Sequence, residues 1–233
     1  MKILGIDTAT NFFSICISEG NMVIYEVRQN RDSFSAKMDA GIFYEIQRAI
    51  RYLDKERLSA IAVSIGPGMF TSLRVGLSIT KGLSISLNIP VVAVNTLDAI
   101  GQAGSRVYSP LFYNCPHYIM VVINAYQEEL YSAIYKQGLR ISEYLLTTAE
   151  DLLNILKNII EKEPGPVIVL GPGASLLKNQ ITNSTARLIF PTECSFLTSA
   201  HLIPIALPLV EKQNFTAPEF LEPFYIKKSP AEK

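Results

Sequence analysis

The chain has few of the residues on which many catalytic and metal-binding sites depend. Its 233 residues include only two histidines, His117 and His201, and three cysteines, Cys16, Cys115 and Cys194. No His-x-x-x-His, His-Glu-x-x-His or Cys-x-x-Cys pattern is present. The sequence therefore predicts no histidine-based metal site, no zinc cage and no disulfide framework. The odd number and wide spacing of the cysteines favour a reducing compartment, and we expect a cytoplasmic protein.

Charge is also scarce. Charged residues make up 18% of the chain, against roughly 25% in ordinary soluble proteins, which suggests that a partner covers part of the surface. The 21 basic and 21 acidic residues cancel, so no overall field would draw the chain onto a nucleic-acid backbone or an anionic membrane. We expect any contact with nucleic acid to be made mainly through another subunit.

The sequence predicts neither a membrane segment nor a leader. The most apolar stretch, residues 200–210, is about half the roughly 20 residues needed to span a bilayer, and it contains Pro204 and Pro208. Only four uncharged residues stand between Lys2 and Asp7, which is too few for the apolar region of a signal peptide.

Hydrophobic periodicity predicts an α/β protein. Residues 3–7, 13–18 and 22–27 alternate as an antiparallel meander, and a helix follows from Ser33 or Ser35 to about Leu53. Strands and helices then alternate to residue 104, which is typical of parallel α/β organisation. The expected elements are a strand over 60–65, a helix capped by Thr71 or Ser72, a strand over 91–94 and a helix capped by Thr96.

A length of 233 residues is enough for two small domains. Residues 101–116 contain two glycines and two prolines, and we place the domain boundary there. We expect a first lobe over 1–104, a second over 105–212, and a tail over 213–233 that could return to the first lobe. The second lobe is predicted to hold strands over 118–123, 129–135, 139–145 and 167–170, a helix over 148–162, and a final helix over 197–213 that is kinked or broken at its prolines.

Residues 64–84 are the most informative stretch. An apolar strand turns through Gly66-Pro67-Gly68 onto a helix, and such a turn can aim backbone N–H groups and the positive end of the helix dipole at an anion. A Walker loop would need Gly-Lys-Ser/Thr at the helix start, whereas Lys81 lies three turns downstream. The residues alone leave open an anion site or an ordinary strand-to-helix turn.

The same stretch, Gly66 to Arg74, resembles the Gly-Pro-Gly-Ser-Phe-Thr-Gly-Leu-Arg signature of the TsaB (YeaZ) family. Residues 3–10 look like the first strand of that family, and residues 122–131 look like its Asp-Ala-Arg-x-Gly-Glu-Val-Tyr segment. Residues 170–174 stand where the family has Gly-Asp-Gly-Ala, and residues 222–227 stand where it ends Pro-x-Tyr-Leu-Arg. These ordered matches span nearly the whole chain.

The resemblance implies an actin/hexokinase-like (ribonuclease H-like) fold of two lobes, with mixed sheets and flanking helices. It also implies a non-catalytic scaffold required for threonylcarbamoylation of a tRNA adenosine. Such a scaffold would bind and organise the catalytic TsaD subunit, which transfers the threonylcarbamoyl group, and a small ATPase, TsaE, would join the assembly. The free protein could be a homodimer, and tRNA would be contacted mainly through the complex.

Two helices rich in small residues are the expected partner surface. The helix after Thr71 is apolar almost all round, which indicates burial on more than one side. The residues alone favour burial within its own lobe, whereas the resemblance favours docking of a helix from TsaD or from a second copy. The interface residues that we expect are Ala36, Ala40, Gly41, Tyr44, Gly76 and Thr80.

A nucleotide or anion site is expected only in vestigial or shared form, at Asp7, Thr8, Thr10, Gly66, Gly68, Thr71 and Arg74. ATP-using members of this fold class place Asp-x-Gly turns in both lobes, so that the backbone approaches phosphates and the acids order magnesium. The first turn here lacks the glycine, and the second reads Asn124-Ala125-Tyr126, with an amide in place of the acid that magnesium prefers. We expect no catalytic residue and no tightly bound cofactor, with ATP or ADP held only at a subunit junction.

Two alternatives remain open at this point, an autonomous ATP-dependent kinase or ATPase of the same fold and a metallopeptidase. The chain departs from the family pattern at Ser72, and Ser33 and Phe34 stand where the family often has a histidine. The sequence has no Gly-x-Ser-x-Gly elbow, which is the motif that would predict a serine hydrolase. Cys16 lies in a strand pattern, where a thiol is expected to be buried and inert.

Overall fold

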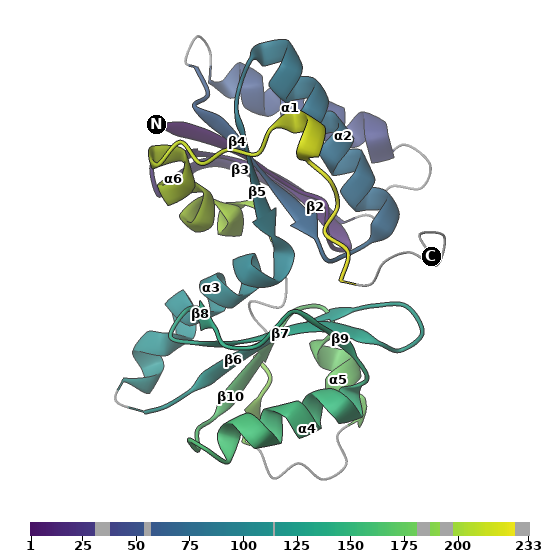
Figure 1. The fold of residues 1–233 in the computed structure, drawn as a ribbon. Helices are drawn as coiled ribbons and strands as arrows, with labels where there is room; N and C mark the ends of the chain where they lie inside the picture. The colour runs from purple at the N-terminus through teal and green to yellow at the C-terminus, as the bar shows by residue number, and fades with distance from the viewer. Residues whose placement is uncertain (31–37, 54–56, 114, 181–186, 192–197, 227–233) are drawn as a thin grey trace. The chain divides into compact units, whose positions relative to one another are not determined.

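The chain folds into two compact α/β units (Figure 1). The computed structural model describes residues 1–233 apart from 31–37, 54–56, 114, 181–186, 192–197 and 227–233. The first unit comprises Met1–Thr96 and Leu197–Phe224, and the second comprises Leu97–Phe196 and Tyr225–Lys233. Each unit has a mixed sheet with flanking helices, as the sequence predicts.

The first unit contains a five-stranded sheet in the order β3-β2-β1-β4-β5. Its strands are β1 (Lys2–Asp7), β2 (Phe12–Glu19), β3 (Met22–Asn30), β4 (Ala60–Gly66) and β5 (Val91–Asn95). The first three pair antiparallel, and β1, β4 and β5 pair parallel. The predicted meander followed by parallel strands is therefore confirmed.

Helices cover both faces of this sheet. Helices α1 (Met38–Tyr52) and α2 (Phe70–Leu87) pack on one face, where Ile42, Ile46 and Leu77 are buried in a shared core with Leu4 and Ile6 of β1. Helix α6 (Ile203–Glu211) follows the short helix η3 (Ser199–Leu202) and packs on β5, β1 and β4. Strand β1 is consequently buried from both sides.

Helix α6 belongs to the first unit, whereas the sequence predicted it in the second lobe. Residues 197–224 belong to the first unit, and the second unit begins at Leu97 inside α3 (Thr96–Tyr108). Ala206 and Val210 are buried on α6, because the apolar second face of the first sheet needs a cover. Local composition cannot show which sheet a distant apolar helix will cover.

The second unit has a sheet in the order β11-β10-β6-β7-β8, with β9 pairing to β7. Its strands are β6 (Tyr118–Asn124), β7 (Leu130–Lys136), β8 (Leu139–Arg140), β9 (Leu145–Thr147), β10 (Val167–Leu170) and β11 (Leu188–Ile189). Helices α4 (Ala149–Ile160) and α5 (Ala174–Gln180) share one core with β6, β7 and β10. Helix α3 packs on the alternate residues of the same strands, where a Cβ at Gly101 would lie 2.6 Å from the Tyr135 ring.

The start of α2 needs correction, and the final helix of the prediction is interrupted. Helix α2 begins at Phe70, and neither Thr71 nor Ser72 caps it, since the N-cap position is Met69 with no side-chain capping bond. The N–H of Met69 donates to the carbonyl of Ala9 at 2.9 Å, so the backbone just before α2 is hydrogen-bonded to the loop after β1. The predicted final helix is divided into η3 and α6, with Pro204 in the first turn of α6, which confirms a break there, whereas α6 continues past Pro208 to Glu211.

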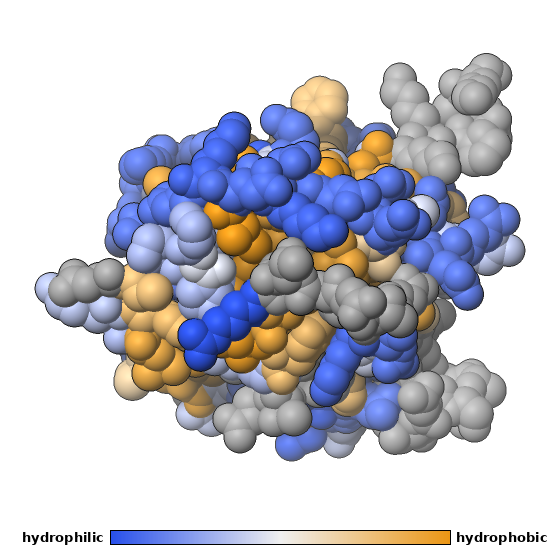
Figure 2. Space-filling view, turned by 90° about the horizontal axis from the view of Figure 1, so that it is seen from below, coloured by the Kyte–Doolittle hydropathy of each residue, from blue (hydrophilic) through white to orange (hydrophobic). Residues whose placement is uncertain are grey.

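Figure 2 views the protein from the side on which α4 lies, and on this face hydrophilic and apolar residues are intermixed. No helix within the described part of the chain is long and apolar enough to cross a membrane.

Candidate functional site

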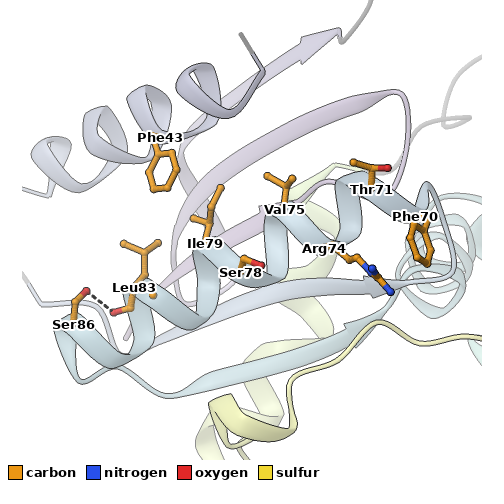
Figure 3. Close-up of a pocket in the computed structure, with 10 residues that line it drawn as sticks. Phe43, Phe70, Thr71, Arg74, Val75, Ser78, Ile79, Leu83 and Ser86 are labelled. Carbon is orange, nitrogen blue, oxygen red and sulfur yellow. Dashed lines mark hydrogen bonds between the residues drawn. The ribbon is translucent and has the colours of Figure 1, made fainter. Parts of the chain in front are cut away.

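A groove of about 710 Å³ lies between α1 and α2 on the outer side of the first unit. Phe43 points from α1 toward α2, and Val75, Ile79 and Leu83 project from α2 into the same space (Figure 3). Phe70 and Arg74 stand at the N-terminal end of the groove and Ser86 at the other end. The groove is therefore an apolar trough along two helices of one unit.

Large apolar side chains at and near this groove are open to solvent. Phe43 is 51% exposed, Phe70 53% and Ile85 73%, and Tyr44 on α1 is 61% exposed. Exposed apolar side chains that gather on one surface are a mark of a binding site, because water leaves them favourably when a partner covers them.

The small residues of α2 lie on two different sides of the helix. Ser78 and Gly82 are exposed in the groove, and a Cβ at Gly82 would have no atom within 4 Å. Gly76 and Thr80 face inward, and the Thr80 hydroxyl donates to the Gly76 carbonyl at 2.8 Å. The outward side of α2 could thus receive a closely packed helix, while the inward side is already filled.

The expected interface residues are therefore not all brought to one surface. Gly76 and Thr80 are buried in the first unit, because α2 needs small residues where it crosses β1. Tyr44 is exposed and Gly41 is half-buried. Ala36 and the side chain of Ala40 lie outside the described residues.

Basic side chains border the groove. Helix α2 carries Arg74 and Lys81 and no acidic residue. On α1, Arg48 and Arg51 are exposed, whereas Glu45 is buried and accepts hydrogen bonds from Arg48 at 3.1 and 3.2 Å. The guanidinium of Arg74 lies over the Phe70 ring at 3.9 Å. Arg74 lines the groove and Lys81 lies on the same helix, whereas Arg48 is paired with Glu45. Among the described residues, the positive rim of the groove is therefore its α2 border.

Asp7, at the end of β1, is the centre of the expected nucleotide-site remnant. Its side chain is fully buried, and Oδ1 accepts hydrogen bonds from Ser64 Oγ at 2.6 Å and from the Ala9 N–H at 3.1 Å. Burial raises the pKa of Asp7 to about 6, although these hydrogen bonds oppose the shift. Among the described residues, Asp7 Oδ2 and the hydroxyls of Thr8 and Thr10 have no hydrogen-bond partner.

The glycine turn beside Asp7 is closed by the protein's own chain. A Cβ at Gly68 would lie 2.2 Å from the Ala9 carbonyl oxygen, and one at Gly66 would lie 3.2 Å from the Phe224 carbonyl oxygen. The Phe224 N–H donates to the Ile65 carbonyl oxygen at 2.7 Å, so the C-terminal segment is hydrogen-bonded to the end of β4 and covers the turn. The remaining two expected site residues, Thr71 and Arg74, line the α1–α2 groove instead.

The second glycine turn, in the second unit, is also tightly packed. A Cβ at Gly173 would lie 3.1 Å from Asn124 Oδ1, and the Gly173 N–H donates to the Val122 carbonyl at 2.9 Å. Tyr126 is 83% exposed beyond the end of β6. This turn thus presents an amide where a magnesium site would use a carboxylate.

His201 and Cys16 have the surroundings of structural residues. His201 Nδ1 accepts a hydrogen bond from the Thr198 N–H at 3.2 Å, and burial lowers the pKa of His201. Cys16 is buried as expected, and burial raises the pKa of its thiol to about 12. Within the described ranges, no group of three or more His, Cys, Asp or Glu side chains is placed to hold a metal ion.

Sequence reasoning missed one close contact between two side chains that can carry chemistry. Ser109 Oγ and His117 Nε2 lie 2.9 Å apart beside a second cavity, in the second unit. Eight residues separate them in the sequence, and no motif signals the contact, because it depends on how the turn after α3 leads into β6.

Comparison with solved structures defines the class of protein. YeaZ from Pseudomonas aeruginosa superposes with a TM-score of 0.76 at 18% identity, over 97% of this chain and 99% of that one. An inorganic polyphosphate/ATP-glucomannokinase from Arthrobacter superposes with a TM-score of 0.52 at 11% identity, over 91% and 99%. The chain therefore has the actin/hexokinase-like fold.

Sequence comparison then gives the family. The family model described as TsaD, tRNA N6-adenosine threonylcarbamoyltransferase, matches residues 45–199. The tRNA threonylcarbamoyladenosine biosynthesis protein TsaB of Bacillus subtilis is 26% identical over 78% of this chain and 75% of its own length. TsaB of Escherichia coli is 24% identical over 100% and 97%. The chain belongs to the TsaB (YeaZ) family, and the TsaD family model covers more than half of it.

Proposed function

We propose that this protein takes part in tRNA threonylcarbamoyladenosine biosynthesis as a non-catalytic subunit that binds a TsaD-type transferase through the α1–α2 groove. Its relatives in B. subtilis and E. coli are named for this biosynthesis. The observation that carries the scaffold role is the exposed apolar trough between α1 and α2, since such a surface is stabilised when a partner covers it.

A single helix of the partner suits the trough best. Gly82 and Ser78 leave room for a close approach, and Phe43 and Phe70 at its border are half exposed, so covering the rest of each ring would contribute about 1 kcal/mol. The positive rim favours a helix with an apolar ridge flanked by Asp or Glu. In a homodimer through this groove, both partners would present an α2 helix that carries basic and no acidic side chains, so a different, acidic subunit is favoured.

Phosphoryl transfer by this chain alone is disfavoured. Asp7 is fully buried with a pKa raised to about 6, the Gly66–Gly68 turn is packed on Ala9, and Asn124 supplies no charge. We propose that the chain by itself holds no cofactor, and that any ATP or ADP binds at its junction with other subunits, including a TsaE-type ATPase. Contact with tRNA would be made mainly through the complex, in the cytoplasm.

Gly82→Arg tests the docking surface. The position is open, so the new side chain fits the free protein, and replacing a helical glycine should if anything raise stability by up to about 1 kcal/mol. The same arginine would stand where the partner helix must lie, and we expect affinity for the TsaD homologue to fall about 100-fold or more. Asn154→Arg, at an exposed position of α4, is the matched control.

The measurements are titration calorimetry with the TsaD homologue and thermal unfolding of each free variant. A folded Gly82→Arg protein with unchanged affinity would exclude the groove as the docking site. Calorimetry of the free chain with magnesium-ATP addresses the kinase alternative, and elemental analysis addresses the metallopeptidase. Tight nucleotide binding with turnover, or stoichiometric metal, would contradict the scaffold proposal.

A further inference from the structure

The second unit holds a cavity of about 420 Å³ beside the turn between α3 and β6, and the proposed tRNA role does not use it. Ser109 is the first residue of the short helix η2 (Ser109–Phe112), and His117 immediately precedes β6. Both line the cavity. Their side chains meet with Ser109 Oγ 2.9 Å from His117 Nε2.

The second contact of the imidazole decides which ring nitrogen carries the proton. His117 Nδ1 lies 3.0 Å from the Cys115 carbonyl oxygen, which can only accept a hydrogen bond. Nδ1 must therefore be the protonated nitrogen, so Nε2 of the neutral ring has a free lone pair and accepts the hydrogen bond of the Ser109 hydroxyl. This is the arrangement of a serine with its general base, with a backbone carbonyl orienting the base.

The surroundings hold this pair in place. His117 is only 5% exposed and stacks on Phe112 with ring centroids 5.3 Å apart. Ser109 is half-buried at the cavity wall. A base that is already oriented toward the hydroxyl costs little entropy to bring into position for proton transfer.

The rest of the cavity combines apolar and charged walls. Phe112 and Tyr113 line it on the η2 side, and the ion-paired side chains of Lys136 and Glu163 line it on the sheet side. The Tyr118 hydroxyl donates to the Glu163 carbonyl at 2.9 Å and anchors that wall. Such a space suits a small acyl group whose carbonyl is polar and whose chain is apolar.

We propose that Ser109 is a nucleophile, activated by His117, that accepts the acyl group of small activated esters in this cavity. Ser109 Oγ forms a bond to the ester carbonyl carbon while its proton passes to His117 Nε2. The carbon–oxygen bond to the leaving alkoxide then breaks, and the alkoxide departs with the bonding electron pair and takes the proton from His117. Water attacking the acyl-serine, with His117 again as base, releases the acid and restores the hydroxyl.

The test uses the full chain with p-nitrophenyl acetate, followed by nitrophenolate release and by peptide mass spectrometry. We expect a burst of nitrophenolate and one acetyl group on Ser109. Ser109→Ala should abolish the burst. His117→Gln should slow the burst about 100-fold or more, because a positioned general base usually accelerates a reaction by at least this factor. Ser175→Ala, at an exposed position of α5, is the matched control and should react as the wild type does.

Peptide mapping of the wild-type protein shows which residue is acetylated, so it tests the proposal even if a variant fails to fold. Acetyl found only on Cys115 or on scattered lysines would overturn the proposal, and so would a burst in folded Ser109→Ala equal to that of the wild type. In either case the Ser109–His117 contact would be a structural hydrogen bond. The outcome is independent of TsaD binding, because the cavity lies in the second unit and the α1–α2 groove in the first.

Discussion

Gly76 on α2 lies directly against Thr8 at the end of β1, where a Cβ added to the glycine would stand 2.3 Å from Thr8 Oγ1. The contact lets the helix cross the sheet closely. It also explains why a glycine stands at this point on the inward side of α2, where a partner cannot reach it.

Gly76→Ala should destabilise the protein by about 1–3 kcal/mol, because the methyl group overpacks the contact with Thr8 and outweighs the better helix propensity of alanine. Gly82→Ala on the open side is the matched control and should stabilise by up to about 1 kcal/mol. Urea unfolding measures both. Equal stability of the two variants would show that α2 can shift away from β1 at no cost.

The stability of the protein should depend on the ionisation of Asp7. The pKa of this carboxyl is about 6 in the folded chain, against an ordinary value of 3.8, so between these values the folded state holds a proton that the unfolded state has released. The contribution of Asp7 to stability therefore falls as pH rises from about 4 to 6, by roughly 3 kcal/mol in total.

Asp7→Asn cannot ionise and should lack this part of the pH dependence. Relative to the wild type, the variant should gain about 2–3 kcal/mol in its free energy of unfolding between pH 4 and pH 7.5. Urea unfolding at the two pH values measures the gain. If the difference between the two proteins is the same at both pH values, Asp7 is not buried as described.

The Asp7→Asn variant should also leave tRNA modification by the reconstituted system nearly unchanged, because the proposed role assigns Asp7 no chemistry.

The positive rim of the groove should make partner binding sensitive to salt. Arg74→Glu places a negative charge at the end of the trough, and we expect slower association with the TsaD homologue and a dissociation constant raised about 10-fold at low salt. The difference from the wild type should shrink at 0.5 M salt, since exposed charges are screened. Lys157→Glu on the exposed side of α4 is the control. Tighter binding by Arg74→Glu would mean that the partner surface is basic.

Asp98 on α3 links three parts of the second unit. It accepts hydrogen bonds from the Tyr135 hydroxyl at 2.7 Å and the Tyr144 hydroxyl at 2.6 Å, and burial beside this carboxylate raises the pKa of Tyr135. Tyr135→Phe should cost about 1 kcal/mol, and Asp98→Ala about 2–3 kcal/mol, because both hydroxyls lose their acceptor. Denaturant unfolding compares them with Glu143→Ala at an exposed position. A neutral Asp98→Ala would show that water replaces the carboxylate.

The secondary structure and the family could largely be predicted from local patterns. The alternation in Phe12–Glu19 matches the two-residue period of a sheet, and the short continuous apolar run Val167–Leu170 suits a strand that is buried on both faces. The glycine turns and the Gly66–Arg74 stretch were enough for the resemblance to TsaB. These features depend on neighbours in the chain, so the sequence by itself determined them.

Contacts between distant segments were decided only by the tertiary structure. Whether Gly76 or Gly82 faces the sheet depends on where α2 crosses β1, and the small residues on the two sides look alike in the sequence. The same is true of the turn at Gly68, which a phosphate could have filled and which Ala9 fills instead. Helix α6 joins the first sheet, and Ser109 meets His117, for a shared physical reason: burial and hydrogen bonding are satisfied by whichever segment folding brings near, and local sequence does not encode that neighbour.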